Sequence, residues 1–108
     1  MSRNPLSMTD PQKCLGEAIV ILRENQPEAA RNLAQRAVEL GLDDPTVWGV
    51  IALANRDLAD YENAQLAADR AIARDPRNAR AYIVKADVFY AQENMKAAAA
   101  FYRTLVHC

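Results

Sequence analysis

Apolar residues recur along the chain at intervals of three and four positions, which is the spacing of one face of an α-helix. In the first such stretch they are Leu15, Ala18, Ile19 and Leu22. No stretch alternates apolar and polar residues as a half-buried β-strand would. The pattern predicts an all-α chain, with helices over residues 11–24, 27–40, 45–58, 61–74, 79–92 and from 95 toward the C-terminus.

Polar residues mark where these helices begin and end. Asp10-Pro11 is a helix start, because the aspartate side chain accepts a free backbone N–H and proline fits the first helical position. Asp44-Pro45 repeats this signal 34 residues later, and Asn78 is a third N-cap after another 34. Gly41 suits the left-handed position that ends a helix. Turns are predicted at Asn25-Gln26-Pro27, Ala59-Asp60 and Glu93-Asn94.

Small residues recur with the same period. In units that begin at Pro11, Pro45 and Ala79, the eighth positions are Ala18, Ala52 and Ala86, and the twentieth are Ala30, Ala64 and Ala98. The twenty-seventh positions are Ala37, Ala71 and Leu105. Two antiparallel helices approach closely only where the side chain at their contact is short. The repeat therefore predicts helix pairs that pack through these small residues.

A 34-residue helix–turn–helix unit of this kind resembles the tetratricopeptide repeat. The middle unit carries the resemblance best, through Trp48, Ala52, Tyr61, Ala64, Ala71 and Pro76, and the third has Tyr82, Ala86, Phe89, Ala98 and Tyr102. The first departs, since Cys14 stands in place of its aromatic residue. The resemblance implies a right-handed α-α superhelix, a solenoid of three antiparallel helix pairs. Its repeats would span about 11–44, 45–78 and 79–108, after a flexible leader of residues 1–10.

The end of the array departs from the family. Tetratricopeptide arrays usually close with an extra amphipathic helix over the last repeat, and this chain stops at Cys108 without one. Each repeat buries its apolar face only against a neighbour. The last helix would then expose Met95, Phe101, Tyr102, Leu105 and Val106. We therefore expect either a piece of a longer protein or a chain that pairs with a partner, possible homo-oligomers included.

Charge and composition narrow the function classes. Thirteen basic and fourteen acidic side chains leave a net charge of −1, without the basic excess of a nucleic-acid binder. Apolar runs such as residues 19–22 are far too short for a membrane span, and the N-terminus lacks the apolar core of a signal peptide. The sequence indicates a cytoplasmic protein with no nucleic-acid or membrane partner.

The residues that could carry chemistry are few. The candidates for a cysteine–histidine nucleophile are Cys14, His107 and Cys108, but nothing in the sequence orients them and two lie at the chain end. With one histidine and no zinc-like cysteine spacing, no metal site is predicted. No glycine-rich phosphate loop or hydrolase motif is present. We expect no catalytic residue, no metal, no cofactor and no enzymatic activity.

A binding surface remains. The resemblance implies that the first helices of the repeats line a concave groove. In this chain the proposed peptide-binding residues are Leu15, Ile19, Leu22, Val50, Leu53, Arg56, Arg80, Ile83, Val84, Asp87 and Tyr90. They form a largely apolar stripe, so the clamp for a terminal carboxylate found in one subclass of the family is not expected. The alternative is that part of the stripe packs within the array.

The expected function is a non-enzymatic module that binds a protein or peptide partner in this apolar groove. An alternative is the N-terminal repeat segment of a larger and possibly enzymatic protein, in which the array recruits substrates or self-associates.

Overall fold

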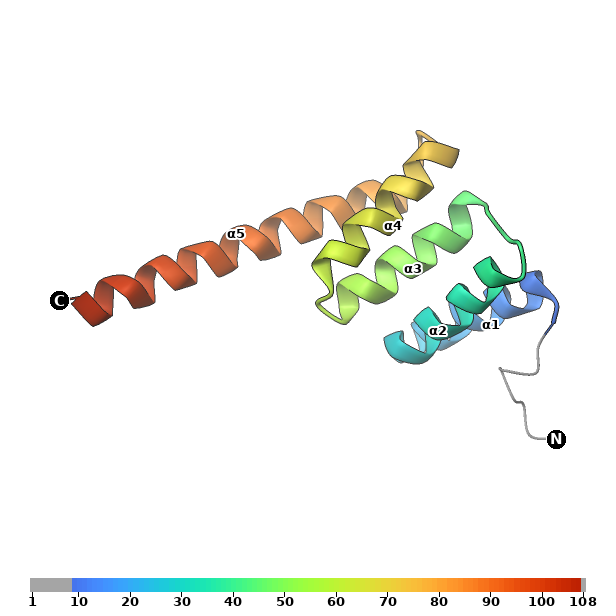
Figure 1. Ribbon diagram of the computed structural model, residues 1–108, viewed down its shortest axis with the longest axis horizontal. Helices are drawn as coiled ribbons and strands as arrows, with labels where there is room; N and C mark the ends of the chain where they lie inside the picture. Colours follow the sequence, from blue (N-terminus) through green and yellow to red (C-terminus); the bar gives the residue numbers. More distant parts are fainter. Residues whose placement is uncertain (1–8, 108) are drawn as a thin grey trace.

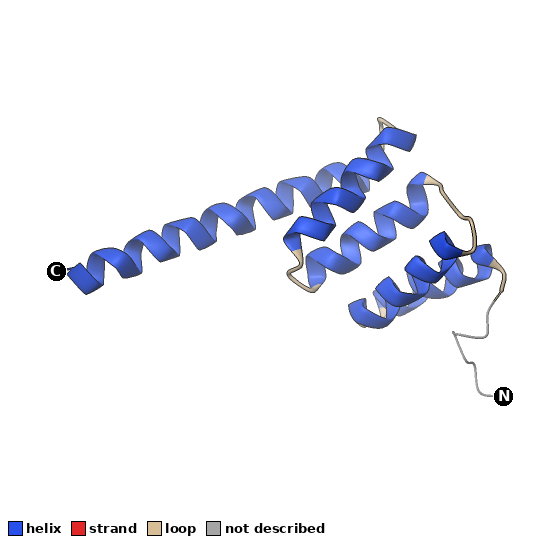
Figure 2. Cartoon of the chain, viewed as in Figure 1, coloured by secondary structure: helices blue, strands red, loops and turns tan. Residues whose placement is uncertain are grey.

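The computed structural model describes the backbone of residues 9–107 and the side chains of residues 9–104. It contains five helices and, over this range, no strand (Figures 1 and 2). They are α1 (Pro11–Arg23), α2 (Pro27–Glu39), α3 (Pro45–Asp57), α4 (Tyr61–Arg74) and α5 (Ala79–His107). The predicted all-α repeat fold is confirmed. Residues 1–8 of the predicted leader lie outside the described residues. The side chains of Leu105, Val106, His107 and Cys108 also lie outside them.

The helices begin at the polar residues that the sequence singled out. A carboxylate oxygen of Asp10 accepts the backbone N–H of Gln12 at 2.9 Å. Asp44 accepts the N–H of Val47 at 2.8 Å, and Asn78 accepts that of Ala81 at 3.0 Å. Each bond satisfies one of the donors left free at a helix start. Gly41, after α2, has a φ of 102°, as the left-handed end of a helix requires.

The first four helices form two pairs, α1 with α2 and α3 with α4, which lie side by side (Figure 1). Alanine fills the eighth and twentieth positions of both repeats, and all four of these side chains are fully buried. A methyl group at these points lets the two helix axes approach closely. The core of these pairs is therefore built mostly from small residues.

The third pair expected from the sequence does not form. Residues 79–107 are one continuous helix, and the turn predicted at Glu93-Asn94 is absent. Around it stand alanine, glutamine, glutamate, methionine and lysine, which all favour a helix interior. Lys96 also pairs with Glu93 at 3.2 Å across the expected break. The first turn, by contrast, ends in Pro27 and the second in Asp60, whose side chain caps α4.

Only the first part of α5 packs on the other helices. Ala81, Val84 and Val88 are buried, and α5 contacts both α3 and α4. From residue 92 to residue 104 every side chain is exposed, and this part projects from the body (Figure 1). The radius of gyration is 16.5 Å, against about 13 Å for a compact chain of this length.

The residues expected to face inward on the third repeat are consequently exposed. They are Tyr82, Ala86, Phe89 and Ala98. The prediction was wrong here because it assumed that the second half of the repeat folds back over the first. The expected exposure of Met95, Phe101 and Tyr102 in an uncapped array is confirmed.

Trp48 joins the two repeats through a polar cluster. Its Nε1–H donates to Asp43 at 2.7 Å, and Asp43 also accepts from Arg74 at 2.8 Å. The guanidinium groups of Arg70 and Arg74 lie over the indole ring, 4.7 and 5.9 Å from its centroid. The hydrogen bonds from Arg74 and then from Trp48 lower the pKa of Asp43 to about 2.

We expect acid to weaken this cluster, because protonation of Asp43 weakens its hydrogen bonds with Arg74 and Trp48. Because the folded-state pKa of Asp43 lies below its ordinary value of 3.8, its contribution is present above about pH 4 and is lost as pH falls toward 2. The measurement is the Tm of the parent protein and of Asp43→Asn from pH 7 to pH 2, with the fluorescence of Trp48 as probe. The gap between the two Tm values should close over that interval. A gap independent of pH would contradict the assignment.

Candidate interaction surface

The proposed groove residues come from α1, α3 and the first half of α5, and the structure brings these helices together. α3 contacts both α1 and α5. Three of the proposed residues are nevertheless core residues, since Leu15 is 5 %, Val50 1 % and Val84 0 % exposed. A side chain with this exposure offers a ligand no contact area, so the predicted apolar stripe is shorter than the sequence suggested.

Their position in the repeat explains the burial. Val50 and Val84 stand at the sixth position of their repeats, on the side of the helix that packs against the preceding pair. The first repeat has no preceding pair, and its sixth residue, Gly16, is exposed. An assignment of faces by analogy placed these two valines on the open surface, whereas the structure buries them. On α5 the open position is that of the preceding residue, Ile83.

Three other apolar members are half-buried. Ile19, Leu22 and Leu53 pack against the core with part of their surface and leave the rest open. On α5, Arg80, Ile83, Asp87 and Tyr90 are exposed, with Ile83 at 53 % and Tyr90 at 66 %. The accessible part of the predicted site therefore runs from α1 across α3 to α5.

Arg56 organises the polar part of this surface. Its Nη1 lies 2.8 Å from Oδ2 of Asp87 on α5, and its Nη2 lies 3.0 Å from Oδ1 of Asp57. The Arg56 side chain is 28 % exposed and Asp87 is 47 % exposed. An ion pair this exposed to solvent adds little to the stability of the fold. It does hold a guanidinium group in a fixed place between Leu53 and the exposed residues of α5.

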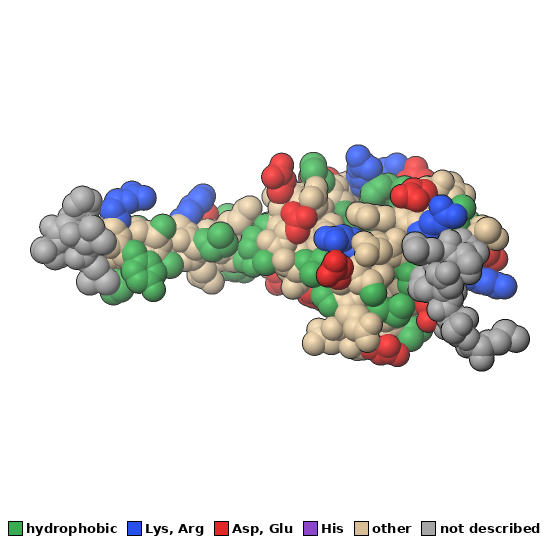
Figure 3. Space-filling view, turned by 60° about the horizontal axis from the view of Figure 1, so that its bottom comes forward, with side chains coloured by type: hydrophobic (Ala, Val, Ile, Leu, Met, Phe, Trp, Pro, Cys, Tyr) green, Lys and Arg blue, Asp and Glu red, His purple; other side chains and the backbone are tan. Residues whose placement is uncertain are grey.

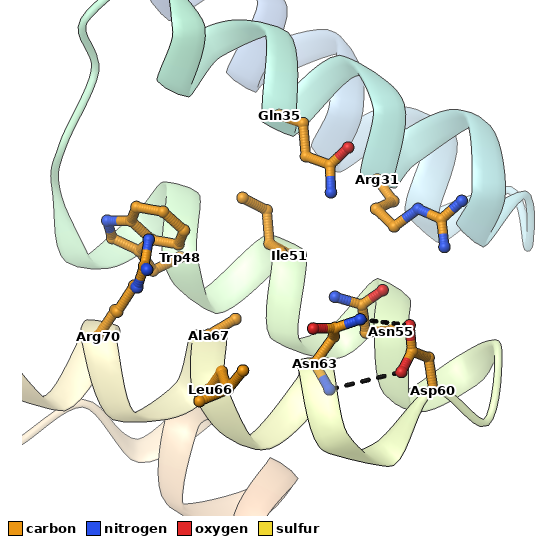
Figure 4. A pocket seen from close by; sticks show the side chains of 10 residues that line it. All are labelled: Arg31, Gln35, Trp48, Ile51, Asn55, Asp60, Asn63, Leu66, Ala67 and Arg70. Atoms are coloured by element: carbon orange, nitrogen blue, oxygen red, sulfur yellow. Dashed lines mark hydrogen bonds between the residues drawn. The ribbon is translucent and has the colours of Figure 1, made fainter.

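A cleft that the sequence analysis did not identify lies elsewhere, between α2, α3 and α4 (Figure 4). Its volume is about 430 Å3. Its walls are Arg31, Gln35, Trp48, Ile51, Asn55, Asp60, Asn63, Leu66, Ala67 and Arg70. Asn55 is 3 % exposed, and its Oδ1 has no hydrogen-bond partner among the described residues. The one signal in the sequence is that Asn55 is polar where the other repeats carry Ile21 and Phe89.

Comparison with known proteins decides the family. A tetratricopeptide repeat model matches residues 50–108, more than half of the chain. The chain belongs to the tetratricopeptide repeat family. No curated protein and no solved structure matches it. The match reaches the C-terminus, so the second half of α5 carries tetratricopeptide sequence although it does not fold back as a second repeat helix would.

Membership of the tetratricopeptide repeat family indicates a protein–protein interaction module. Within the described residues no helix is long and apolar enough to cross a membrane. The cytoplasmic location expected from the sequence stays a prediction.

Proposed function

We propose that this tetratricopeptide array binds a partner peptide or helix across the surface of α1, α3 and the first half of α5. The observation that carries the proposal is the row of accessible apolar side chains beside a fixed ion pair. The apolar side chains are Ile19, Leu22, Leu53, Ile83 and Tyr90, and the ion pair of Arg56 with Asp87 joins two of the helices that carry them. An apolar helix face that also carries one polar side chain is the class of ligand that such a surface suits.

Preorganisation supports this function. The helices that carry the surface are held in place by their neighbours. Helix α3 packs on α2 and α4, and helix α5 packs on α3 and α4. Leu53 is half-buried, so part of its side chain is already held by the core. The partner would then bear most of the ordering cost of association. A partner carboxylate could replace Asp87 at Arg56, and a partner amine could pair with Asp57 or Asp87.

The central prediction is that Leu53→Asp removes binding. A carboxylate in the middle of the apolar row would be desolvated by the partner without a new cation, so affinity should fall at least about tenfold, which corresponds to 1.4 kcal/mol. The measurement is quantitative affinity capture from the native lysate, with the tagged parent and variant side by side and helix content checked by circular dichroism.

Leu66→Asp is the matched control. Leu66 is a leucine on α4 that is 54 % exposed and lines the other cleft. The Leu66→Asp variant should capture the same proteins in the same amounts as the parent. If Leu53→Asp and the parent capture the same amounts of partner, the proposal that this surface binds the partner is wrong. Loss in Leu66→Asp alone would move the site to the cleft between α2, α3 and α4.

A second candidate role is that of a repeat segment within a larger protein, where the array would recruit substrates or self-associate. The observation that favours self-association is the distribution of exposed apolar side chains. Among the described residues, seven of the nine exposed large hydrophobic side chains lie on α5. A patch of this kind commonly marks a contact with another protein.

A further inference from the structure

The cleft between α2, α3 and α4 contains a buried amide without a partner. Asn55 on α3 is 3 % exposed, and its side chain lines the cleft (Figure 4). Among the described residues its Oδ1 has no hydrogen-bond partner. A buried polar group left unpaired costs stability, and the first and third repeats carry Ile21 and Phe89 at this position. The packing of α3 therefore does not explain the amide, whereas a ligand that bonds to it would.

Two charged side chains of the same cleft also lack a partner of opposite charge. Charged side chains gather over the body, whereas hydrophobic ones follow the projecting part of α5 (Figure 3). Some of these charges are paired, as Arg56 is with Asp87. Arg31 on α2 and Asp60 at the start of α4 line the cleft, and within the described part of the chain neither forms an ion pair.

Asp60 keeps part of its hydrogen-bonding capacity for a ligand. Its Oδ1 accepts the backbone N–H of Asn63 at 3.4 Å, and its Oδ2 accepts from Nδ2 of the same residue at 2.8 Å. Each carboxylate oxygen has a second lone pair. Arg31, Asn55 and Asp60 lie toward one end of the cleft (Figure 4). That end therefore presents a cation, an anion and an amide together.

The middle of the cleft is apolar. Ile51, Leu66 and Ala67 line it there (Figure 4). Ile51 and Ala67 are each 4 % exposed and belong to the core, so their positions are fixed, whereas Leu66 is 54 % exposed. Trp48 and Arg70 lie at the other end, with the guanidinium group 4.7 Å from the centroid of the indole ring. An apolar group placed on these side chains would be removed from water, which favours binding.

We propose that this cleft binds a free α-amino acid with an apolar side chain. The carboxylate of the ligand pairs with Arg31, and its ammonium group donates to Asp60 and to the amide of Asn55. Its side chain lies on Ile51 and Leu66. Because the last torsion of an asparagine side chain has a broad, two-fold preference, the amide can turn its oxygen toward the ammonium group.

The charges of the cleft favour a zwitterion over other small molecules. A simple carboxylate would pair with Arg31 but has no donor for Asp60 or Asn55, and an amine would leave Arg31 without a partner. A charge or an amide buried without a partner is unfavourable. The volume of about 430 Å3 lies within the range of small-molecule sites, roughly 300 to 1,000 Å3. None of the lining residues belongs to the surface of α1, α3 and α5 proposed above, so the two sites are separate.

The test is a titration of the isotope-labelled chain with L-leucine, followed by two-dimensional NMR. The side-chain amide signal of Asn55 should shift and reach saturation. N-acetyl-L-leucine lacks the ammonium group and L-leucinamide lacks the carboxylate, so each leaves a charged residue of the cleft unpaired. Both should bind at least about tenfold more weakly than L-leucine. L-Serine, which cannot cover Ile51 and Leu66, should also bind more weakly.

Variants of the cleft locate the binding site. Asn55→Leu should remove binding and keep the Tm at least as high as that of the parent, because an apolar side chain of the same branched shape replaces an unpaired amide. Arg31→Gln should weaken the binding of L-leucine about tenfold or more, since a charge-assisted contact is lost. Arg77→Gln is its control, because Arg77 is exposed and lies outside the cleft, and it should bind as the parent does.

Several outcomes would overturn this assignment. If millimolar L-leucine shifts no signal of the cleft, no amino acid binds there. Binding of N-acetyl-L-leucine, L-leucinamide or L-serine as tight as that of L-leucine overturns the ligand class. Unchanged binding by Asn55→Leu or Arg31→Gln overturns the location, and Arg31→Gln decides alone if circular dichroism shows that Asn55→Leu has lost its helices. None of these outcomes bears on the surface around Leu53.

Discussion

Val84→Asp is expected to destabilise the array by about 3 to 5 kcal/mol, the range found when a buried charge is left without a partner. Val84 is fully buried in the core cluster, where α5 packs on α3 and α4. Natural domains are stable by only about 5 to 15 kcal/mol. The substitution should therefore release α5 from the body and lower the Tm of the whole chain.

Ile83→Asp is a matched control, because Ile83 is the preceding residue of the same helix and is 53 % exposed. Its Tm should lie close to that of the parent, since exposed substitutions usually change stability by about 0.5 kcal/mol or less. Urea unfolding followed by circular dichroism measures both variants. Equal destabilisation by the two would mean that α5 is rotated from the orientation described here. Val84 would then be open to a ligand, as the sequence analysis had expected.

Ala64→Leu is expected to lower stability by about 1 to 3 kcal/mol, because it forces a larger side chain into a filled contact. Ala64 is fully buried at the twentieth position of the second repeat, where α4 packs on α3. Leucine is as good a helix former as most residues, so loss of helix propensity does not explain such an effect. Ala52→Leu, on the facing helix, should behave in the same way.

The measurement is the midpoint of chemical unfolding, with Ala73→Leu as the control on the same helix. Ala73 is exposed, so leucine there has room. If Ala64→Leu and Ala73→Leu unfold at the same denaturant concentration, the close contact between α3 and α4 lies elsewhere. A variant of Ala64 that is more stable than the parent would indicate an unfilled space at this point.

Much of the fold follows from local sequence. The ends of α1 to α4 agree with the sequence prediction within one residue. The reason is that Asp10, Asp44 and Gly41 act through their own backbone neighbours, and such effects are visible in the sequence. The turn predicted at the polar pair Glu93-Asn94 does not form. Without a proline or a side-chain cap there, helix propensity prevailed over the repeat.

The site was less predictable, because it depends on which face of each helix meets a neighbour. The sequence predicted that α1, α3 and the first half of α5 lie together, and α3 does contact both of the others. The burial of Val50 and Val84 follows from how α3 and α5 pack in the array. The ion pair of Arg56 with Asp87 joins residues 31 positions apart, so it could not be predicted from a local sequence pattern. The cleft around Asn55 needs three helices in place before it exists.

The order in which the helices pack has a consequence for how the chain folds. The main contacts join each helix to one that is one or two places away along the chain. Proteins with contacts this local have low contact order and fold fast. Because the units interact only with their neighbours, structure can start in either complete repeat and spread from there. Folding should then be modular, with α5 gaining its order from a pair that is already formed.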